Sequence, residues 1–159
     1  MFERFDADAR RVVVRAAYEE AQALGSASLE GEHLLLALAA DPSTGAGGLL
    51  VDSGLDHDGL VAALERETER SLAAVGIALS DYEPAARPAA GRRKASFATS
   101  SKRALARAVG VASARGDRVV STAHLLVGIL RGEIGTVPRA LEAVGVDRVT
   151  LMIAAERLL

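Results

Sequence analysis

The chain has 159 residues, half of them apolar and 3% aromatic, with a formal net charge of -2 at pH 7. This length holds one ordinary domain or two small repeats, and the charge gives no reason to expect a nucleic-acid partner. No cysteine is present, which excludes disulfides, thiolate metal sites and cysteine nucleophiles. No apolar run approaches the roughly 20 residues that span a bilayer, and the charged start does not resemble a signal peptide. We therefore expect a cytoplasmic protein without a membrane partner.

The first part of the chain has the apolar spacing of helices. Residues at intervals of three and four form one apolar face in each segment, and glycines at Gly25 and Gly54 mark two of the helix ends. Asp56 is placed to cap the longest of the later helices. The predicted helices lie at about 6–24, around 33–38, at about 46–53 and from Asp56 past Leu72, with a loop at 41–48.

Residues 76–96 are predicted to be a linker. The stretch from Ser80 to Ser96 has two prolines and no apolar period, and it contains the basic cluster Arg92, Arg93 and Lys94. Such a composition is typical of a solvated connection between folded units. Binding of an acidic partner by the basic cluster is the alternative interpretation.

After the linker the helical pattern starts again. Thr99, Ser100 or Ser101 is placed to cap a helix that Gly116 ends. A short helix is predicted at about 122–130, and another follows with Pro138 in its first turn, where proline is tolerated. The last 13 residues, beginning at Asp147, close the chain as a final helix.

The two parts repeat one another. The stretch "EHLLLAL" around His33 returns as "AHLLVGI" around His124, 91 residues later, and Leu50 and Leu141 have the same separation. Earlier in each part the separation is one residue greater, because Phe5 and Phe97 are 92 residues apart. A nearly constant offset through several predicted helices indicates a duplicated unit. We therefore predict an all-α fold of about eight helices, built from two four-helix repeats related by a pseudo-twofold axis: repeat one at 1–75, the linker at 76–96 and repeat two at 97–159.

Several phrases resemble the N-terminal repeat domain of the Clp/Hsp100 protein unfoldases, most closely the ClpC type. The opening "MFERFDADARRVVV" is similar to the start of that family, and "GEHLLLAL" with "TAHLLVGIL" is similar to its paired histidine phrases. "LLVDSGLD" and "ALEAVGVD" are similar to its paired Leu-Gly turns. The resemblance covers almost the whole chain apart from the linker, which is longer than the family usually has.

The resemblance implies a binding module without catalytic activity. In the family this domain precedes two ATPase modules and receives substrates and adaptors for unfolding and degradation. The expected partners are Clp ATPase or protease components, substrate proteins or adaptors, and peptide-like small molecules. A stand-alone paralogue is favoured over an excised domain by the divergent second phrase and the basic linker. A structural interaction protein unrelated to proteolysis and an enzyme using a groove between the repeats are the alternatives.

Six residues are candidates for ligand or adaptor binding because of the resemblance. ClpC-type domains have a surface for adaptors and peptide-like ligands, and its positions correspond here to Phe2, Arg10, Val13, Phe97 and Lys102. Glu32 matches a glutamate that contacts the guanidinium of phosphoarginine, but a carboxylate in the first turn of a helix is also favoured by the amide dipoles alone. The phenylalanines likewise have a structural interpretation, as hydrophobic staples at helix starts.

This sequence departs from the family at the phosphoarginine positions. Ala123 replaces the second glutamate, and Asp6 and Ala98 replace the threonines that follow the leading aromatic residues. Assuming that Glu32 shares a site with Asp6, and Lys102 with the position of Ala123, neither site is complete. We therefore expect weak or absent phosphoarginine binding, with any residual binding dependent on Glu32.

No catalytic, metal or cofactor site is predicted. The chain lacks a G-x-x-x-x-G-K-[ST] phosphate loop and a G-x-S-x-G nucleophile elbow. His33 and His124 each adjoin a Leu-Leu pair without a second metal ligand at helical spacing, so a hydrogen-bonded structural role is predicted for both. His57 is expected at the surface.

Overall fold

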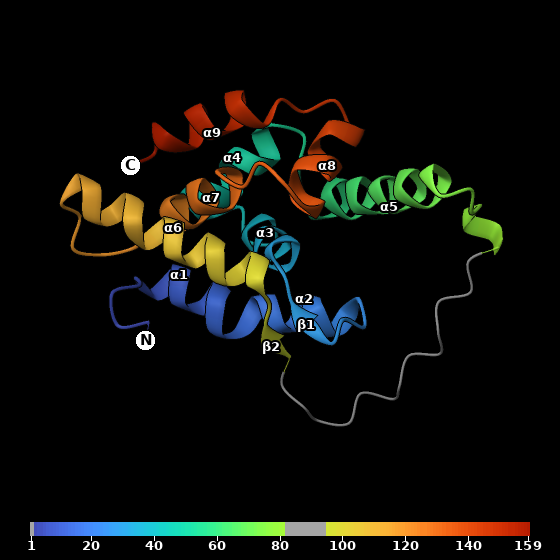
Figure 1. Ribbon diagram of the computed structural model, residues 1–159. Helices are drawn as coiled ribbons and strands as arrows, with labels where there is room; N and C mark the ends of the chain where they lie inside the picture. Colours follow the sequence, from blue (N-terminus) through green and yellow to red (C-terminus); the bar gives the residue numbers. More distant parts are fainter. Residues whose placement is uncertain (1, 82–94) are drawn as a thin grey trace.

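The computed structural model describes residues 2–81 and 95–159, and these are almost entirely helical (Figure 1). The first half begins with one unbroken helical segment made of three parts, and shorter helices follow it. In chain order the elements are α1 (Ala7–Arg11), the π-helical turn η1 (Val12–Ala16), α2 (Ala17–Ala23), the short strand β1 (Ser28–Leu29), α3 (Gly31–Ala39), α4 (Gly45–Asp52), α5 (His57–Ala74) and the 3₁₀ turn η2 (Leu79–Asp81).

The second half repeats this order. Its elements are β2 (Ser96–Phe97), α6 (Thr99–Arg115), α7 (Thr122–Leu130), α8 (Thr136–Ala143) and α9 (Arg148–Glu156). The bounds of α7 and α8 follow those of α3 and α4 by 91 residues, and α6 follows the first segment by 92. The all-α fold of two repeats is therefore confirmed for the described part of the chain. The boundaries at 75 and 97 stay a prediction, although Ser96, assigned to the linker, belongs to β2.

The two halves exchange backbone hydrogen bonds reciprocally. Leu29 of β1 pairs in parallel with Phe97 of β2, while Phe5 forms an isolated parallel bridge with Val120. Phe5 and Phe97 are equivalent in the repeat, as are Leu29 and Val120, so the second contact is the symmetry mate of the first. The amide of Asp6 donates to Val120 O at 3.0 Å, and the equivalent amide of Ala98 donates to Leu29 O at 3.0 Å. A mutual contact of this kind is the mark of a twofold relation.

The π-helical turn explains why the repeat offset changes by one. Phe5 and Gly25 are 20 residues apart, whereas Phe97 and Gly116 are 19 apart. The first half therefore has one additional residue in its first helix, and η1 accommodates it as a single wide turn. The equivalent helix α6 has no such interruption. An inserted residue that is accommodated as a π turn leaves the rest of the helix in register with its surroundings.

The core lies around α3 and α7, at the centre of Figure 1. Almost every residue of these two helices is buried, and they contact one another as well as most of the other helices. Because the chain is poor in aromatic residues, leucine, valine and alanine fill this space. The largest side chains with almost no exposure are Val12, Leu29, Leu34, Leu36, Leu38, Leu50, Leu55, Leu60, Leu125, Leu126, Leu130 and Leu141.

The capping predictions are confirmed for one repeat and wrong for the other. Asp56 accepts a hydrogen bond from Gly59 N at 2.8 Å, as predicted. The N-cap of α6 is Ala98 and has no side-chain cap, because the neighbouring serines bond to the first repeat instead. Ser101 Oγ donates to Leu29 O at 2.5 Å, and Ser100 Oγ accepts from Gly31 N at 3.0 Å. The serines therefore join the two repeats.

Parts of the predicted linker can be compared with the structure. After α5, Gly76 takes a positive φ of 79° and a 3₁₀ turn follows at Leu79–Asp81. The basic cluster Arg92, Arg93 and Lys94 lies outside the described residues. Within residues 2–81 and 95–159, no helix has the length and apolarity required to cross a membrane.

Candidate functional site

Four of the five aromatic residues of the chain come together where the repeats meet. The Phe2 ring lies 5.3 Å from the ring of Phe5, edge to face, and 6.1 Å from that of Phe97. Tyr18 stands edge to face against Phe97 at 5.7 Å. Phe5 is buried, whereas Phe2, Tyr18 and Phe97 are only partly buried. We call these three residues the aromatic face, which has atoms from both repeats available for contact.

The other residues predicted for this surface differ in exposure. Arg10 and Lys102 occupy equivalent repeat positions, and both side chains are exposed. Arg10 donates to Phe5 O at 3.4 Å, which places it beside the aromatic cluster. Val13 has no exposed surface, so it cannot touch a ligand in this conformation and belongs to the packing beneath the face.

Glu32 lies elsewhere, in a cavity of about 570 Å³ between the repeats. We call it the inter-repeat cavity. It contains none of the three aromatic-face residues, so the six predicted binding residues belong to two separate places. Its walls are formed by residues 30–32, 98–100 and 134–139. The remaining lining residues are Arg103, Ala104, Arg107, Ile129 and Gly132.

The carboxylate of Glu32 is held in an unfavourable environment. Burial raises the pKa of Glu32, and the negative charges of Glu30 and Glu67 raise it further. A hydrogen bond from its own backbone amide and the positive charge of Arg139 offset only part of this effect. The carboxylate of Glu30, by contrast, has hydroxyl partners: it accepts hydrogen bonds from Ser28 Oγ at 3.0 Å and from the Ser100 hydroxyl. A cation beside Glu32 would relieve this repulsion, so this part of the cavity wall favours a positive charge.

We expect the variant Glu32→Gln to be more stable than the parent protein at pH 7. The folded-state pKa of Glu32 is raised, so its charged form disfavours folding, and this penalty appears as pH rises through the folded pKa. Thermal unfolding measured from pH 3 to pH 8 should show a stabilisation at neutral pH that vanishes in acid, where both states are protonated. Glu30→Gln is the control and should destabilise, because it weakens two hydrogen bonds to serine. Equal melting temperatures for Glu32→Gln and the parent at pH 7 would contradict the prediction.

The structure corrects the assumed pairing of the phosphoarginine positions. Glu32 shares its cavity with Ala98 of the second repeat, whereas Asp6 bonds through its amide to Val120 and caps α1 by accepting from Ala9 N at 2.7 Å. Because Leu29 pairs with Phe97 and Phe5 pairs with Val120, the histidine phrase of each repeat lies beside the first residues of the other repeat. Repulsion by Asp6 therefore does not bear on Glu32, and Ala123, which is 5% exposed, offers no acceptor on the opposite side. Weak phosphoarginine binding stays a prediction, now with a single site at most.

An ion pair joins the repeats beside this cavity. Glu67 of α5 is 7% exposed and accepts from Arg139 Nε of α8 at 2.8 Å and from Ser71 Oγ at 2.6 Å. Burial alone would raise the pKa of Glu67, but the hydrogen bonds from Ser71 and Arg139 outweigh it and lower the pKa. Arg139 is thus engaged, although its side chain remains about half exposed.

The predicted hydrogen-bonded role of both phrase histidines is confirmed. His33 Nδ1 accepts from Glu30 N at 2.9 Å, and the equivalent His124 Nδ1 accepts from Ser121 N at 3.1 Å. Burial lowers the pKa of His33, which favours the neutral ring that such an acceptor requires. His57 is partly exposed and contacts Glu20 through Nε2 at 2.9 Å, so it connects α5 to α2.

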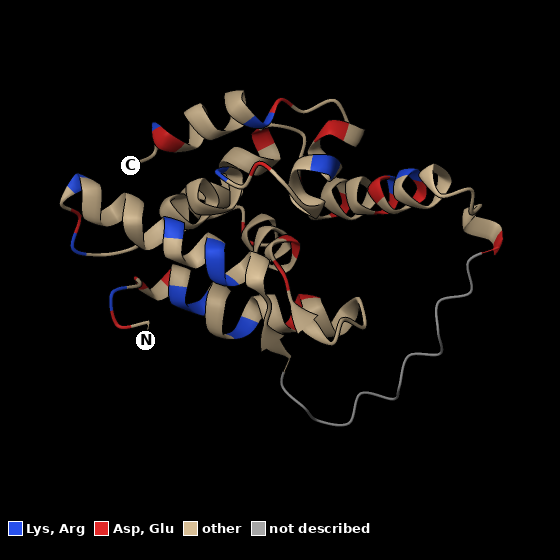
Figure 2. Cartoon of the chain, viewed as in Figure 1, with Lys and Arg blue, Asp and Glu red and all other residues tan. Residues whose placement is uncertain are grey.

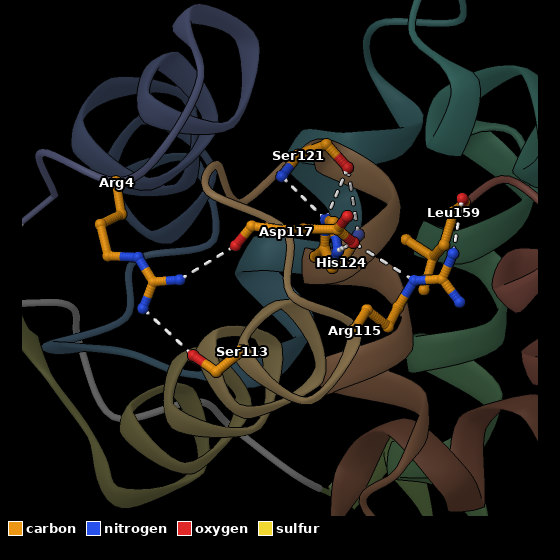
Figure 3. Close-up of polar contacts among 7 residues, drawn as sticks. All are labelled: Arg4, Ser113, Arg115, Asp117, Ser121, His124 and Leu159. Atoms are coloured by element: carbon orange, nitrogen blue, oxygen red, sulfur yellow. Dashed lines mark hydrogen bonds and ion pairs between the residues drawn. The ribbon is translucent and has the colours of Figure 1, made fainter.

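His124 belongs to a polar cluster that ties both ends of the chain to the loop after α6 (Figure 3). Its Nε2 lies 3.1 Å from Asp117 Oδ2, and Ser121 Oγ lies 2.9 Å from Nδ1. Arg4 donates to Ser113 Oγ and to Asp117 O, and Arg115 donates to Leu159 O at 2.9 Å. Figure 3 shows Arg4 and Arg115 reaching this loop from opposite sides.

The Ser121, His124 and Asp117 contacts have the residue types of a hydrolase triad. They are better explained as a helix cap, because Ser121 is the N-cap of α7 and the same His-to-amide bond occurs at α3, where Glu30 replaces the serine. His124 is 5% exposed, and none of the three residues lines the inter-repeat cavity. Among the described residues no group of three or more potential metal ligands was found.

Sequence reasoning missed three residues of these sites. Tyr18 completes the aromatic face, yet nothing in its helical position distinguishes it from other residues of the first helix. Arg103 and Arg107 line the inter-repeat cavity, and the repeat offset contained the signal for them. They are the equivalents of Arg11 and Arg15, and comparing the charges of the two repeats residue by residue would have drawn attention to them.

The fold and its sites define a pseudo-twofold helical repeat domain with surfaces suited to binding. Sequence comparison identifies the family of this domain. The family model of the Clp repeat (R) N-terminal domain matches residues 4–144 and again 96–159. The chain belongs to this family, which is a domain of Clp ATPases that binds substrates and adaptors. No curated protein matches the chain at a significant level.

Solved structures share the fold of this chain. The N-terminal domain of the chaperone ClpD from Arabidopsis thaliana superposes with a TM-score of 0.70 at 24% identity, covering 99% of this chain and 96% of that one. The Hsp104 N-terminal domain from Candida albicans gives 0.64 at 18% identity, covering 98% and 91%. A structure from a malarial protein secretion system gives 0.67 at 19% identity, covering 98% and 94%. At these identities the likeness concerns the fold.

Proposed function

We propose that this chain is a non-catalytic recognition module of the Clp unfolding and degradation system that binds substrate, adaptor or peptide-like ligands through the aromatic face. The observation that carries the proposal is the partly exposed group of Phe2, Tyr18 and Phe97, contributed by both repeats. In a chain with 3% aromatic residues, most of them gather at one place on the surface. Such anchors provide large contact area at low conformational cost.

The surroundings of the aromatic face favour a peptide ligand. Arg10 and Lys102 are exposed cations at equivalent positions of the two repeats, so they can donate to carbonyl or carboxylate oxygens of a bound segment. The aromatic rings would take an apolar side chain between them. Family membership supports the same class of partner, because the family binds substrates and adaptors.

The test is the binding of a fluorescent peptide with an apolar anchor, selected from a display library against the parent protein. Phe97→Ala should weaken binding at least tenfold, since an interface anchor typically contributes more than about 1.4 kcal/mol. Phe2→Ala should act in the same direction. Val51→Ala is the matched control, because Val51 is an exposed apolar residue of α4 and its loss should change binding less than twofold. Unchanged affinity in both phenylalanine variants, with the helical spectrum retained, would refute the proposal.

The link to proteolysis requires a second experiment. Tagged chain incubated with purified Clp ATPase and protease subunits from its own organism should retain them on a column, and Phe97→Ala should reduce the retention. Absence of any Clp subunit would favour the alternative of a structural interaction protein unrelated to proteolysis. The cap-like geometry around His124 gives no support to the enzymatic alternative.

A further inference from the structure

The basic residues of the first helix recur in the second repeat, but their acidic partners do not. Arg11 forms ion pairs with Asp8, at 3.2 Å, and with Asp41. Arg15 pairs with Glu19 at 2.9 Å. In the first repeat, both guanidinium groups therefore face carboxylates of the same chain.

In the second repeat the corresponding carboxylates are missing. The repeat offsets relate Arg11 to Arg103 and Arg15 to Arg107, whereas Asp8 becomes Ser100 and Asp41 becomes Gly132. Helix α6 carries basic residues but no acidic residue along its whole length, while the first helix carries both kinds (Figure 2). The second repeat thus retains both guanidinium groups, but it lacks carboxylates equivalent to those that pair with Arg11 and Arg15 in the first repeat.

Both guanidiniums line the inter-repeat cavity. Arg103 is exposed and makes no hydrogen bond or ion pair with another residue of 2–81 and 95–159. Arg107 is partly buried and donates to Gly128 O at 2.8 Å. Burial lowers the pKa of Arg107, and the like charge of Arg103 lowers it further. Within residues 2–81 and 95–159, neither of these neighbouring cations therefore forms an ion pair with a carboxylate.

We propose that the inter-repeat cavity binds an acidic side chain of a partner protein, whose carboxylate is held by Arg103 and Arg107 as Asp41 is held by Arg11 in the first repeat. A guanidinium and a carboxylate match in planar, two-pronged geometry. A carboxylate at this position would take the place that Asp41 occupies in the other repeat. The first repeat is thus an internal example of the complex that the second repeat lacks.

The other lining residues of the cavity determine which residues can adjoin the acidic residue in the bound segment. Ile134 is 93% exposed on the cavity wall, and it offers an apolar contact to a neighbouring residue of the same segment. Glu30 and Glu32 belong to the part of the wall formed by the start of α3, and they would repel a second carboxylate. The expected ligand segment therefore has one acidic residue next to an apolar residue, without a run of acidic residues.

The site can be tested by NMR titration of the full chain with N-acetyl-aspartate N-methylamide, its asparagine analogue and inorganic phosphate. The aspartate probe should shift the amide signals of Arg103, Arg107 and Gly132, and the asparagine analogue should not. In Arg103→Ala the dissociation constant should rise by about ten- to a hundredfold, the effect of losing one charged hydrogen-bonding partner. Arg118→Ala is the matched control, because Arg118 is an exposed cation of the same repeat that does not line the cavity, and the affinity of this variant for the aspartate probe should stay within twofold of the parent.

A second variant keeps the test independent of a loss of folding. Gly132→Asp restores the carboxylate of the first repeat, and a Cβ at this position would lie 3.2 Å from Arg107 Nη1 and 3.1 Å from Ile129 O. The variant should abolish the shifts caused by the aspartate probe while its spectrum remains dispersed. Equal shifts with the asparagine analogue, unchanged affinity in Arg103→Ala, or binding of phosphate alone would each overturn the proposal. The aromatic face is not involved, so failure of either proposal leaves the other standing.

Discussion

Replacing Gly128 by alanine is expected to lower the free energy of unfolding by about 2 kcal/mol, although alanine is the better helix former. Gly128 lies in α7 where it meets α6, and a Cβ there would stand 2.5 Å from Ala104 O and 2.7 Å from Ala108 N. These are backbone atoms, so no side chain can move aside and the two helices must separate. The equivalent position of the first repeat is Ala37, which shows that the restriction belongs to this helix pair.

A second glycine in the same helix pair separates the steric cost of an added Cβ from the higher helix propensity of alanine. Gly110 of α6 has nothing within 4 Å of its Cβ position, so Gly110→Ala should stabilise by roughly 0.5–1 kcal/mol. Thermal unfolding measures both variants, with a decrease of roughly 4–8 °C for Gly128→Ala and a small increase for Gly110→Ala. A melting temperature for Gly128→Ala equal to or above that of the parent would show that the helices can move apart at little cost.

Replacing Arg139 by alanine should destabilise the protein by about 1–3 kcal/mol, because it leaves the carboxylate of Glu67 buried with only Ser71 as a partner. Loss of a fully buried pair costs more, and the half-exposed side chain of Arg139 reduces the expected value. Since the pair lowers the pKa of Glu67, its stabilisation exists above the unfolded pKa and disappears as pH falls through the folded one. Urea unfolding at pH 7 and at pH 3 should therefore show a large difference from the parent at neutral pH and a small one in acid.

The surface pair of Arg131 and Glu156 provides the comparison for Arg139. Its atoms are 3.1 Å apart, but both side chains are substantially exposed, so Arg131→Ala should cost less than about 1 kcal/mol. If the two arginine variants were equally stable at pH 7, burial of Glu67 would have no energetic consequence. The prediction would then fail.

The repeat in the sequence predicted most of the fold. The helix bounds, the glycine-terminated ends and the equivalence of His33 with His124 depend on local spacing, which a linear sequence displays directly. Even the change of offset from 92 to 91 had a structural counterpart, the π turn at Val12–Ala16. The caps of α6 were wrong because Ser100 and Ser101 bond to the first repeat, and this choice depends on a contact between residues about 70 positions apart.

The sites were less predictable because each of them combines residues of both repeats, and the sequence does not show which residues of one repeat lie beside which residues of the other. Glu32 was assigned to a site with Asp6 on the assumption that each repeat forms its own site. The structure places it with residues of the other repeat, since the strands are exchanged. Tyr18 acquires significance only through Phe97, which is distant in sequence. Arg103 could have been noticed by comparing the charges of the two repeats, but the cavity that it lines could not. Glu67 shares the three-and-four spacing of the buried residues Leu60 and Ala63 of α5. The partner that makes its burial tolerable, Arg139, is 72 positions away and comes from α8.

The reciprocal pairing of Leu29 with Phe97 and of Phe5 with Val120 has a consequence for the origin of this architecture. Each half offers the other the backbone partners that it cannot provide for itself, so two separate copies of one half could associate as a homodimer through the same contacts. Joining such copies in a single polypeptide makes their association intramolecular and independent of concentration. Once fused, the halves are free to diverge. One copy can retain the internal ion pairs of Arg11 and Arg15 while the other loses them and opens its guanidiniums to a partner.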